Sequence, residues 1–231
     1  MNSLEDNYYN NFYERIFSKG ILGFLQRQIH HKLDRQFEAD EFDSILEVGA
    51  GKLEHLVAGT KLSVGRYLAT DIRFTNKDLL ISKLPLLSLK IGEVSLEDVD
   101  AQKLPYEDDC FDGLIATCLL IHLKDPEAAL LEWRRVVKNG GEIVIYVPCE
   151  PGLMLRLGRQ LAVIPKHLRF GHSQYKLLCA REHISSINIL NVYIKNVFDL
   201  DKIKVSTWPI PLLRSWNLNL AYFYHIKVIK N

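Results

Sequence analysis

The sequence predicts an α/β fold built on a doubly wound, mostly parallel sheet. Short apolar segments of strand length alternate along the chain with segments of helical periodicity, an order typical of parallel sheets covered by helices on both faces. The composition is that of a globular protein, with 48% hydrophobic and 25% charged residues, which excludes a disordered chain or a coiled coil. At 231 residues, one core is expected rather than two.

Residues 1–43 are predicted to form an N-terminal helical cap. Residues 4–38 contain no proline, and apolar side chains recur every three or four positions between Ile21 and Leu33, as in an amphipathic helix. Acidic residues stand where a signal peptide carries positive charge, and no apolar segment follows them. We therefore expect a cytoplasmic protein in which the main domain, 44–231, follows the cap.

Seven segments of the main domain have the character of strands. They are bounded by glycine, proline or polar residues and cover 44–49, 66–71, 94–99, 111–117, 142–147, 202–207 and 220–229. Helices are expected from Lys52 for about two turns, from Asp125 to about Gly140, and over 180–197. An N-cap aspartate followed by proline marks the start of the second helix, and glycine suits a left-handed cap at its end.

Residues 149–180 interrupt the alternation of strands and helices. They contain glycines, prolines and basic residues, so we predict a lid inserted over the substrate side of the site. Within it, the segment from Leu153 to Phe170 interleaves leucines with arginine and lysine. An amphipathic lid helix explains this pattern; contact with an anionic substrate or a membrane surface is the alternative.

Charge and cysteine usage narrow the classes of partner. The chain has 29 Lys plus Arg against 28 Asp plus Glu, so no nucleic-acid partner is expected. Its four cysteines form no CxxC pair, and no acidic or histidine grouping has metal-ligand spacing, so no metal is predicted. The longest apolar stretch, 113–121, is about half of the roughly 20 residues that span a bilayer. We expect a small-molecule acceptor and no transmembrane segment, and leave peripheral membrane contact open.

The segment Leu46–Lys52 carries the first chemical signal. A buried strand leads into Gly-x-Gly and then a helix, which lets a ligand approach backbone amides closely. A dinucleotide site places its third glycine where this chain has Glu54. Glu47, just before the loop, suits a ligand with an ammonium and a sulfonium better than a pyrophosphate. Asp71, 24 residues further on, lies near the distance of a ribose-binding carboxylate.

The next segment carries a resemblance. Residues 100–112 read D-A-Q-K-L-P-Y-E-D-D-C-F-D and resemble the segment D-A-x-x-L-P-F-x-x-x-x-F-D of the class I methyltransferase family often called type 11. The resemblance continues through 117–127 to E-W-R-R-V-V-K-N-G-G at 132–141, which is similar to the family's E-x-x-R-V-L-K-P-G-G. The chain departs from the family at Leu53, where a third glycine is common, and at Asn139, where proline is usual.

This resemblance covers roughly 44–148 and implies a Rossmann-like sheet of seven strands with an antiparallel strand near the C-terminus, and S-adenosylmethionine (SAM) as cofactor. By position, it implies cofactor contacts in four groups: Glu47, Gly49, Ala50 and Gly51 at the methionine part, Asp71 at the ribose, Asp100, Ala101 and Gln102 at the adenine, and Thr117 and Cys118 along the floor. His55, on the first helix, is expected to reach the cofactor's carboxylate.

The predicted function is transfer of a methyl group from SAM to a small polar acceptor, with a sugar or glycolipid hydroxyl as the expected class. His122, after the fourth strand, and His172, in the lid, are the candidate general bases, because a hydroxyl must lose its proton as it is methylated. No spacing singles out one base among the lid histidines. Two alternatives stay open: a nicotinamide-dependent oxidoreductase, and a non-catalytic SAM-binding regulator, to which Leu53 is the only hint.

Overall fold

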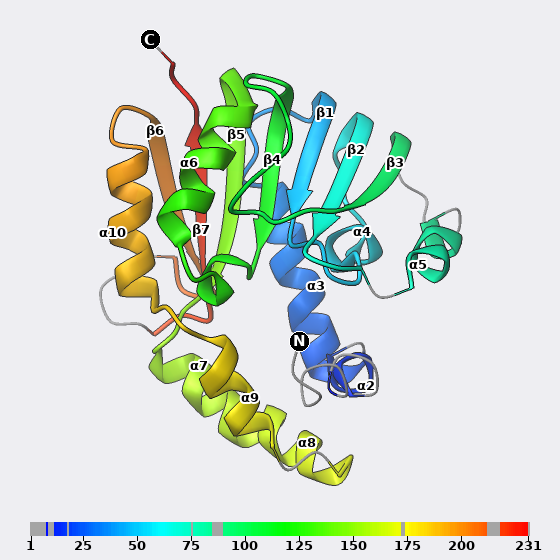
Figure 1. Cartoon of the computed structure of the whole chain (residues 1–231). Coiled ribbons are helices and arrows are strands. Elements are labelled where there is room, and N and C mark those ends of the chain that lie inside the picture. Colours follow the sequence, from blue (N-terminus) through cyan, green and yellow to red (C-terminus); the bar gives the residue numbers. More distant parts are fainter. Residues whose placement is uncertain are drawn as a thin grey trace.

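The computed structural model describes residues 8, 12–17, 19–74, 76–84, 90–171, 174–211 and 218–230. Its centre is a seven-stranded sheet in the order β3-β2-β1-β4-β5-β7-β6 (Figure 1). The strands are β1 (Glu41–Val48), β2 (Ser63–Asp71), β3 (Ile91–Asp98), β4 (Phe111–Thr117), β5 (Val137–Pro148), β6 (Lys202–Trp208) and β7 (Ala221–Lys227).

Strands β1 to β5 pair in parallel, and β7 lies antiparallel between β5 and β6. This confirms the predicted doubly wound, mostly parallel sheet with an antiparallel strand near its C-terminal end. The strand order reverses between β1 and β4, both of which pair in parallel. In such sheets a ligand binds outside the carboxyl ends of the strands at this point, so the fold directs attention to the loops after Val48 and Thr117.

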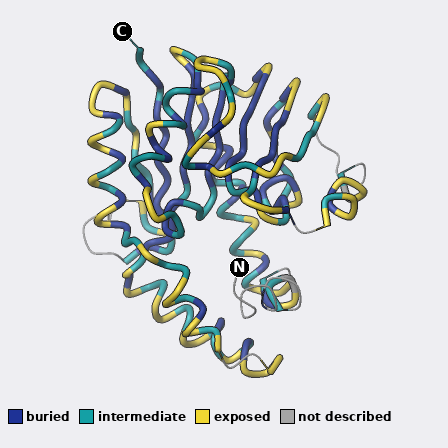
Figure 2. The backbone as a smooth tube through the Cα atoms, viewed as in Figure 1, coloured by how far each residue is buried: buried dark blue, intermediate teal, exposed yellow. Residues whose placement is uncertain are grey.

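Helices cover both faces of the sheet. The helical elements are α2 (Tyr13–Phe17), α3 (Gly20–Asp34), α4 (Glu54–Ala58), α5 (Lys77–Lys83), η2 (Leu120–His122), α6 (Pro126–Val136), α7 (Leu153–Gly158), η3 (Arg159–Val163), α8 (Ile164–Arg169), α9 (Tyr175–Glu182) and α10 (Ile187–Val197). Apolar residues of α6 and α10 form one core with one face of the sheet, and residues of α3 and α4 form a second core with the other face. Figure 2 shows the central strands as the most continuously buried part of the molecule, whereas the edge strands β3 and β6 are partly exposed.

Two predicted helix boundaries were wrong. The helix from Asp125 ends at Val136, and Gly140 lies inside β5, because the two glycines serve an irregularity of the strand. Gly140 has φ +78, and a Cβ on Gly141 would lie 2.6 Å from Val137 Cγ1. The helix predicted over 180–197 is two helices, α9 and α10, separated by a turn at 183–186 whose serine caps α10.

The segment 153–182, here called the arm, comprises α7, η3, α8 and α9. It lies beyond the carboxyl ends of the strands, on the same side as α2 (Figure 1). The two regions touch, because the Tyr8 hydroxyl lies 3.2 Å from His167 Nε2 and the Lys166 ammonium donates to the carbonyl of Ile16. Within the described ranges, no helix has both the length and the apolar character needed to cross a membrane.

Candidate cofactor and acceptor site

The loop after β1 requires glycine at two positions. Gly49 and Gly51 have φ of +67 and +55, a region that side chains with a Cβ avoid. A Cβ on Gly49 would also lie 2.8 Å from Leu119 Cδ1. The neighbouring Ala50 is buried and donates its amide to the Thr70 carbonyl at 2.9 Å. The loop therefore packs between the ends of β2 and β4, and the close approach of a ligand to its backbone stays a prediction.

Three carboxylates surround this loop. Glu47 is fully buried and accepts a 2.8 Å hydrogen bond from the Tyr67 hydroxyl. Asp71 accepts from the Gly51 amide at 2.9 Å, and Glu54 accepts from the Lys52 amide at 3.0 Å. Burial raises the pKa of all three carboxyls, that of Glu47 to about 7 even though His55 and the Tyr67 hydroxyl oppose the shift.

The arrangement fits a cationic ligand. A pyrophosphate at the loop would be repelled by these carboxylates when they are ionised, whereas an ammonium or sulfonium would be attracted and would favour their ionised form. Oε1 of Glu47 is buried and has no hydrogen-bond partner among the described residues, and an unsatisfied buried acceptor is costly until a donor meets it. An ammonium group supplies such a donor, so these residues fit SAM.

The helix after the loop begins in an unusual conformation. Leu53, at the position where the resembling family often has glycine, is left-handed with φ +61. Its side chain is buried in the core beneath α4. Glycine adopts this left-handed conformation without strain. In this chain leucine adopts it, and its buried side chain contributes packing to the core.

His55 is enclosed beside α3. Its Nε2 lies 3.1 Å from Asp34 Oδ1, and its ring centroid lies 5.6 Å from that of His30. Asp34 also accepts from the Thr60 hydroxyl and the Lys61 amide. The described contacts thus join His55 to the N-terminal helix, and its contact with the cofactor stays a prediction.

The segment expected at the adenine is fastened to α6. Asp100 follows the end of β3 by two residues, is exposed, and accepts from the Gln102 amide at 2.9 Å. The carbonyl of Ala101 accepts from Trp133 Nε1 at 3.0 Å, and Gln102 Oε1 accepts from the Asp125 amide at 2.9 Å. The motif therefore holds this loop against α6 while Asp100 keeps a carboxylate at the surface of the sheet edge.

Thr117 and Cys118 lie where β4 ends. Thr117 is the last residue of the strand, and Cys118 turns the chain with φ +56 while its amide donates to the Tyr146 carbonyl at 2.9 Å. Burial raises the pKa of the Cys118 thiol to about 12. The thiol is neutral at physiological pH, which suits a lining group and not a nucleophile.

A second polar cluster joins the arm to the carboxyl end of the sheet. Glu150 follows β5, and its Oε2 lies 2.5 Å from His183 Nδ1 and 2.7 Å from Nη2 of Arg159. Burial raises the pKa of Glu150, but the hydrogen bonds from His183 and Arg159 outweigh it and lower the pKa to about 2. The carboxylate is thus ionised and holds His183 by Nδ1, while Nε2 of His183 has no hydrogen-bond partner among the described residues.

His122 lies beside this pair. Its ring centroid is 5.0 Å from that of His183, and its Nδ1 is 3.1 Å from the Glu182 carbonyl oxygen. Burial, reinforced by His183, lowers the pKa of His122 to about 4, so the ring is neutral at pH 7. The amides of Ile184 and Ser185 donate to the Ile121 carbonyl, which fixes His183 next to the loop after β4.

The sequence has several histidines in and just after the predicted lid, and no spacing singles out His183, which follows the lid, or points to Glu150. The pairing joins residues 33 positions apart on two elements, and no local spacing signals it. The other candidate base, His172, lies outside the described residues.

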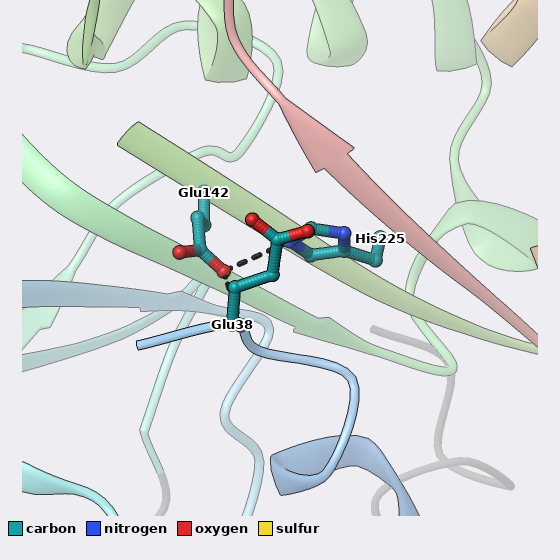
Figure 3. A group of neighbouring side chains, drawn as sticks. All are labelled: Glu38, Glu142 and His225. Atoms are coloured by element: carbon teal, nitrogen blue, oxygen red, sulfur yellow. Dashed lines mark hydrogen bonds and ion pairs between the residues drawn. The ribbon is translucent and has the colours of Figure 1, made fainter. Parts of the chain in front are cut away.

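A third group, at the opposite end of the sheet, has the composition of a metal site. Glu38, Glu142 and His225 bring possible ligand atoms within 4.8 Å of one another (Figure 3). Glu142 Oε2 already accepts from His225 Nε2 and from the Glu38 amide, both at 2.8 Å. Two lysine ammoniums, of Lys204 and Lys227, approach the same carboxylates. Lysines supply the positive charge that a cation would bring, so the group is accounted for as an ion-pair network, and the absence of a metal stays a prediction.

The central part of the chain is similar to known proteins. Residues 46–145 match the model of a family described as a methyltransferase domain. An uncharacterized methyltransferase of Schizosaccharomyces pombe is 32% identical over 118 residues, which are 49% of this chain and 41% of that protein. Phosphatidylethanolamine N-methyltransferase of Cereibacter sphaeroides is 32% identical over 101 residues, 41% of this chain and 49% of that one. The chain thus spans about half the length of the curated relatives it matches.

Solved structures share the fold over the whole chain. A putative SAM-dependent methyltransferase of Methanococcus maripaludis superposes with a TM-score of 0.65 at 16% identity, covering 100% of this chain and 96% of that one. A SAM-dependent methyltransferase of Thermotoga maritima, described as a possible histamine N-methyltransferase, gives 0.58 at 16% identity and covers 99% of this chain and 100% of that one. The whole chain, with its N-terminal helices and its arm, is therefore about as long as solved proteins of this fold.

Proposed function

We propose that the protein transfers the methyl group of SAM to a small polar acceptor, because residues 46–145 match the model of a methyltransferase domain and the fold superposes on that of a putative SAM-dependent methyltransferase. The observation that carries the proposal is the acidic glycine loop. Glu47, Glu54 and Asp71 surround backbone that a ligand can approach closely, and their charge selects a cation. The nicotinamide-dependent alternative requires a pyrophosphate at the same place and is disfavoured.

We assign the binding of the acceptor to the cluster of Glu150, His183 and His122. Methyl transfer from a sulfonium is an in-line displacement, so alignment and exclusion of water are the enzyme's main tasks. We assign the closing of the site to the segment 149–180 and the N-terminal helices. For a hydroxyl acceptor, His183 held by Glu150 is the best-placed group to take the proton, with His122 as a neutral neighbour. His172 keeps its predicted role as an alternative base.

A sugar or glycolipid hydroxyl remains the acceptor class that we propose. The basic arm supports it, because sugar phosphates and many lipid headgroups are anionic. One relative is named for methylation of phosphatidylethanolamine, which supports a lipid-borne acceptor as a class. A cytoplasmic location is part of the same proposal.

Titration calorimetry with SAM, S-adenosylhomocysteine and NAD tests the cofactor. We expect both sulfur ligands to bind and to stabilise the fold by about 2.7 kcal/mol at 100 times their dissociation constants, with no response to NAD. A response to NAD alone would overturn the proposal. Binding of SAM without transfer of its labelled methyl group to any sugar, glycolipid or phospholipid acceptor would favour the regulatory alternative.

A further inference from the structure

The outer face of the arm carries a stripe of exposed leucines. α7, η3 and α8 follow one another without an intervening loop, so 153–169 is one continuous helix with a π turn inside it. Leu153, Leu157, Leu161 and Leu168 are spaced by four, four and seven residues, which places them on one face, and they are 55, 45, 78 and 58% exposed. In Figure 2 the arm projects from the sheet, and exposed residues alternate along it with half-buried ones.

The same segment is strongly basic. Residues 151–181 contain six Lys or Arg and no Asp or Glu. Since the whole chain has 29 Lys plus Arg against 28 Asp plus Glu, the remainder holds 23 against 28, a net charge of −5. Arg156, Arg169, Lys176 and Arg181 are exposed, and none of them forms an ion pair within the part of the chain that the structure describes.

We propose that this face of the arm docks on the surface of an anionic lipid bilayer. A helix with an apolar stripe and flanking cations lies in the interface, with its leucines among the acyl chains and its arginines at the headgroups. Charge favours this occupant over a second copy of the chain, because a symmetric contact through this face brings two basic surfaces together. The docking goes beyond methyl transfer and does not require it.

The position of the arm gives the docking a consequence for the acceptor. Arg159 lies in the same helix and turns inward to Glu150. A bilayer against the outer face therefore lies on the far side of the helix that holds the Glu150–His183 pair. An acceptor that resides in the bilayer must then pass around this helix to reach the pair.

Vesicle sedimentation tests the proposal with the full chain. We expect binding to phosphatidylcholine vesicles that contain about 30% phosphatidylglycerol and little binding to phosphatidylcholine alone, since each cation near an anionic surface adds about a threefold to tenfold gain in partitioning. Binding should fall steeply at about 1 M salt, where charges are screened within about 3 Å. No sedimentation with either vesicle would overturn the proposal.

Two pairs of variants locate the contact. Arg156→Gln with Arg169→Gln should weaken binding about thirty-fold, and Leu157→Ser with Leu161→Ser at least about tenfold. The matched controls carry the same changes elsewhere, Lys195→Gln with Lys202→Gln and Ile189→Ser with Val192→Ser, at exposed positions, and should bind as wild type does.

Equal binding by arm and control variants would overturn the assignment. So would a concentration-dependent dimer that the leucine pair abolishes in the absence of vesicle binding, because the face would then belong to a second copy. Each variant is checked for SAM binding by calorimetry. A protein that binds vesicles but not SAM would refute the proposed function alone, and one that binds SAM but not vesicles would refute the docking alone.

Discussion

Gly49→Ala probes the tightest contact of the glycine loop. The new methyl group would lie 2.8 and 2.9 Å from the two Cδ atoms of Leu119 and 3.1 Å from its Cβ, at a residue with φ +67. Two costs are therefore expected. Left-handed backbone costs alanine about 1–2 kcal/mol, and forcing an extra carbon into a packed contact typically costs about 1–3 kcal/mol more.

Gly140→Ala separates these two costs. Gly140 has φ +78, and a Cβ there would meet nothing within 4 Å, so only the backbone cost applies. We expect a loss of about 1–2 kcal/mol in the free energy of unfolding for the control and about 2–5 kcal/mol for Gly49→Ala. Leu119→Ala removes the two closest atoms, so the double variant should recover about 1–2 kcal/mol relative to additivity.

Urea denaturation measures the free energies, and calorimetry measures SAM affinity. Gly49→Ala should weaken SAM binding because the loop must move away from Leu119. Gly140 lies near the amino end of β5, away from the loop, so Gly140→Ala should leave the affinity unchanged. The reasoning is refuted if the two alanine variants lose equal stability, or if Leu119→Ala brings no recovery.

Three further outcomes are expected. Glu47→Gln removes a carboxyl whose folded pKa of about 7 exceeds its unfolded value near 4.3, so the wild type loses up to about 3 kcal/mol of stability as pH rises from about 4 to 7. In denaturation experiments the stability of the variant should therefore rise relative to that of the wild type over this pH range, and the variant should bind SAM more weakly. Equal dependence of stability on pH in the two proteins would contradict the assignment. His183→Asn should lower kcat about 10²- to 10⁴-fold with SAM affinity within about twofold, whereas Glu150→Gln should lower kcat less and alter its pH profile; unchanged turnover in His183→Asn would exclude it as the base. EDTA should leave turnover unchanged. A loss of turnover that a divalent cation restores would contradict the predicted absence of a metal and would point to the group that contains Glu142.

The sheet was predictable because its evidence is local. Phe111–Thr117 was predicted with both its bounds, since a short apolar run that contains aromatic and β-branched residues is typical of a buried strand. The capped start at Asp125 was predicted for the same reason. Glycine, by contrast, supports both a helix end and an irregular strand. The helix was therefore predicted to run to Gly140, although Val137 pairs with Phe111 and Glu142 with Gly113, which puts Gly140 at a shift of register inside β5.

In the candidate site, too, the parts that depend on local segments were predictable and the part that depends on a long-range contact was not. The contacts expected of the cofactor lie in segments where chain order and spatial order agree, from Glu47 through Asp71 to Cys118. The Glu150–His183 pair depends on how the arm folds back to the sheet, through the bonds of Ile184 and Ser185 to the Ile121 carbonyl. A contact of that kind leaves no trace in spacing.

The N-terminal helix shows how the two halves of the molecule are coupled. Leu33 of α3 shares one core with Leu56 of α4 and Tyr67 of β2, and Tyr67 holds the buried Glu47. The same helix presents Asp34 to His55, whose charge in turn opposes the raised pKa of Glu47. Because a buried carboxylate is stabilised only by the groups around it, the ionisation of Glu47 depends on α3 as well as on the loop that contains it. A helix that precedes the matched segment 46–145 in sequence is thereby part of the electrostatic environment of the candidate cofactor site.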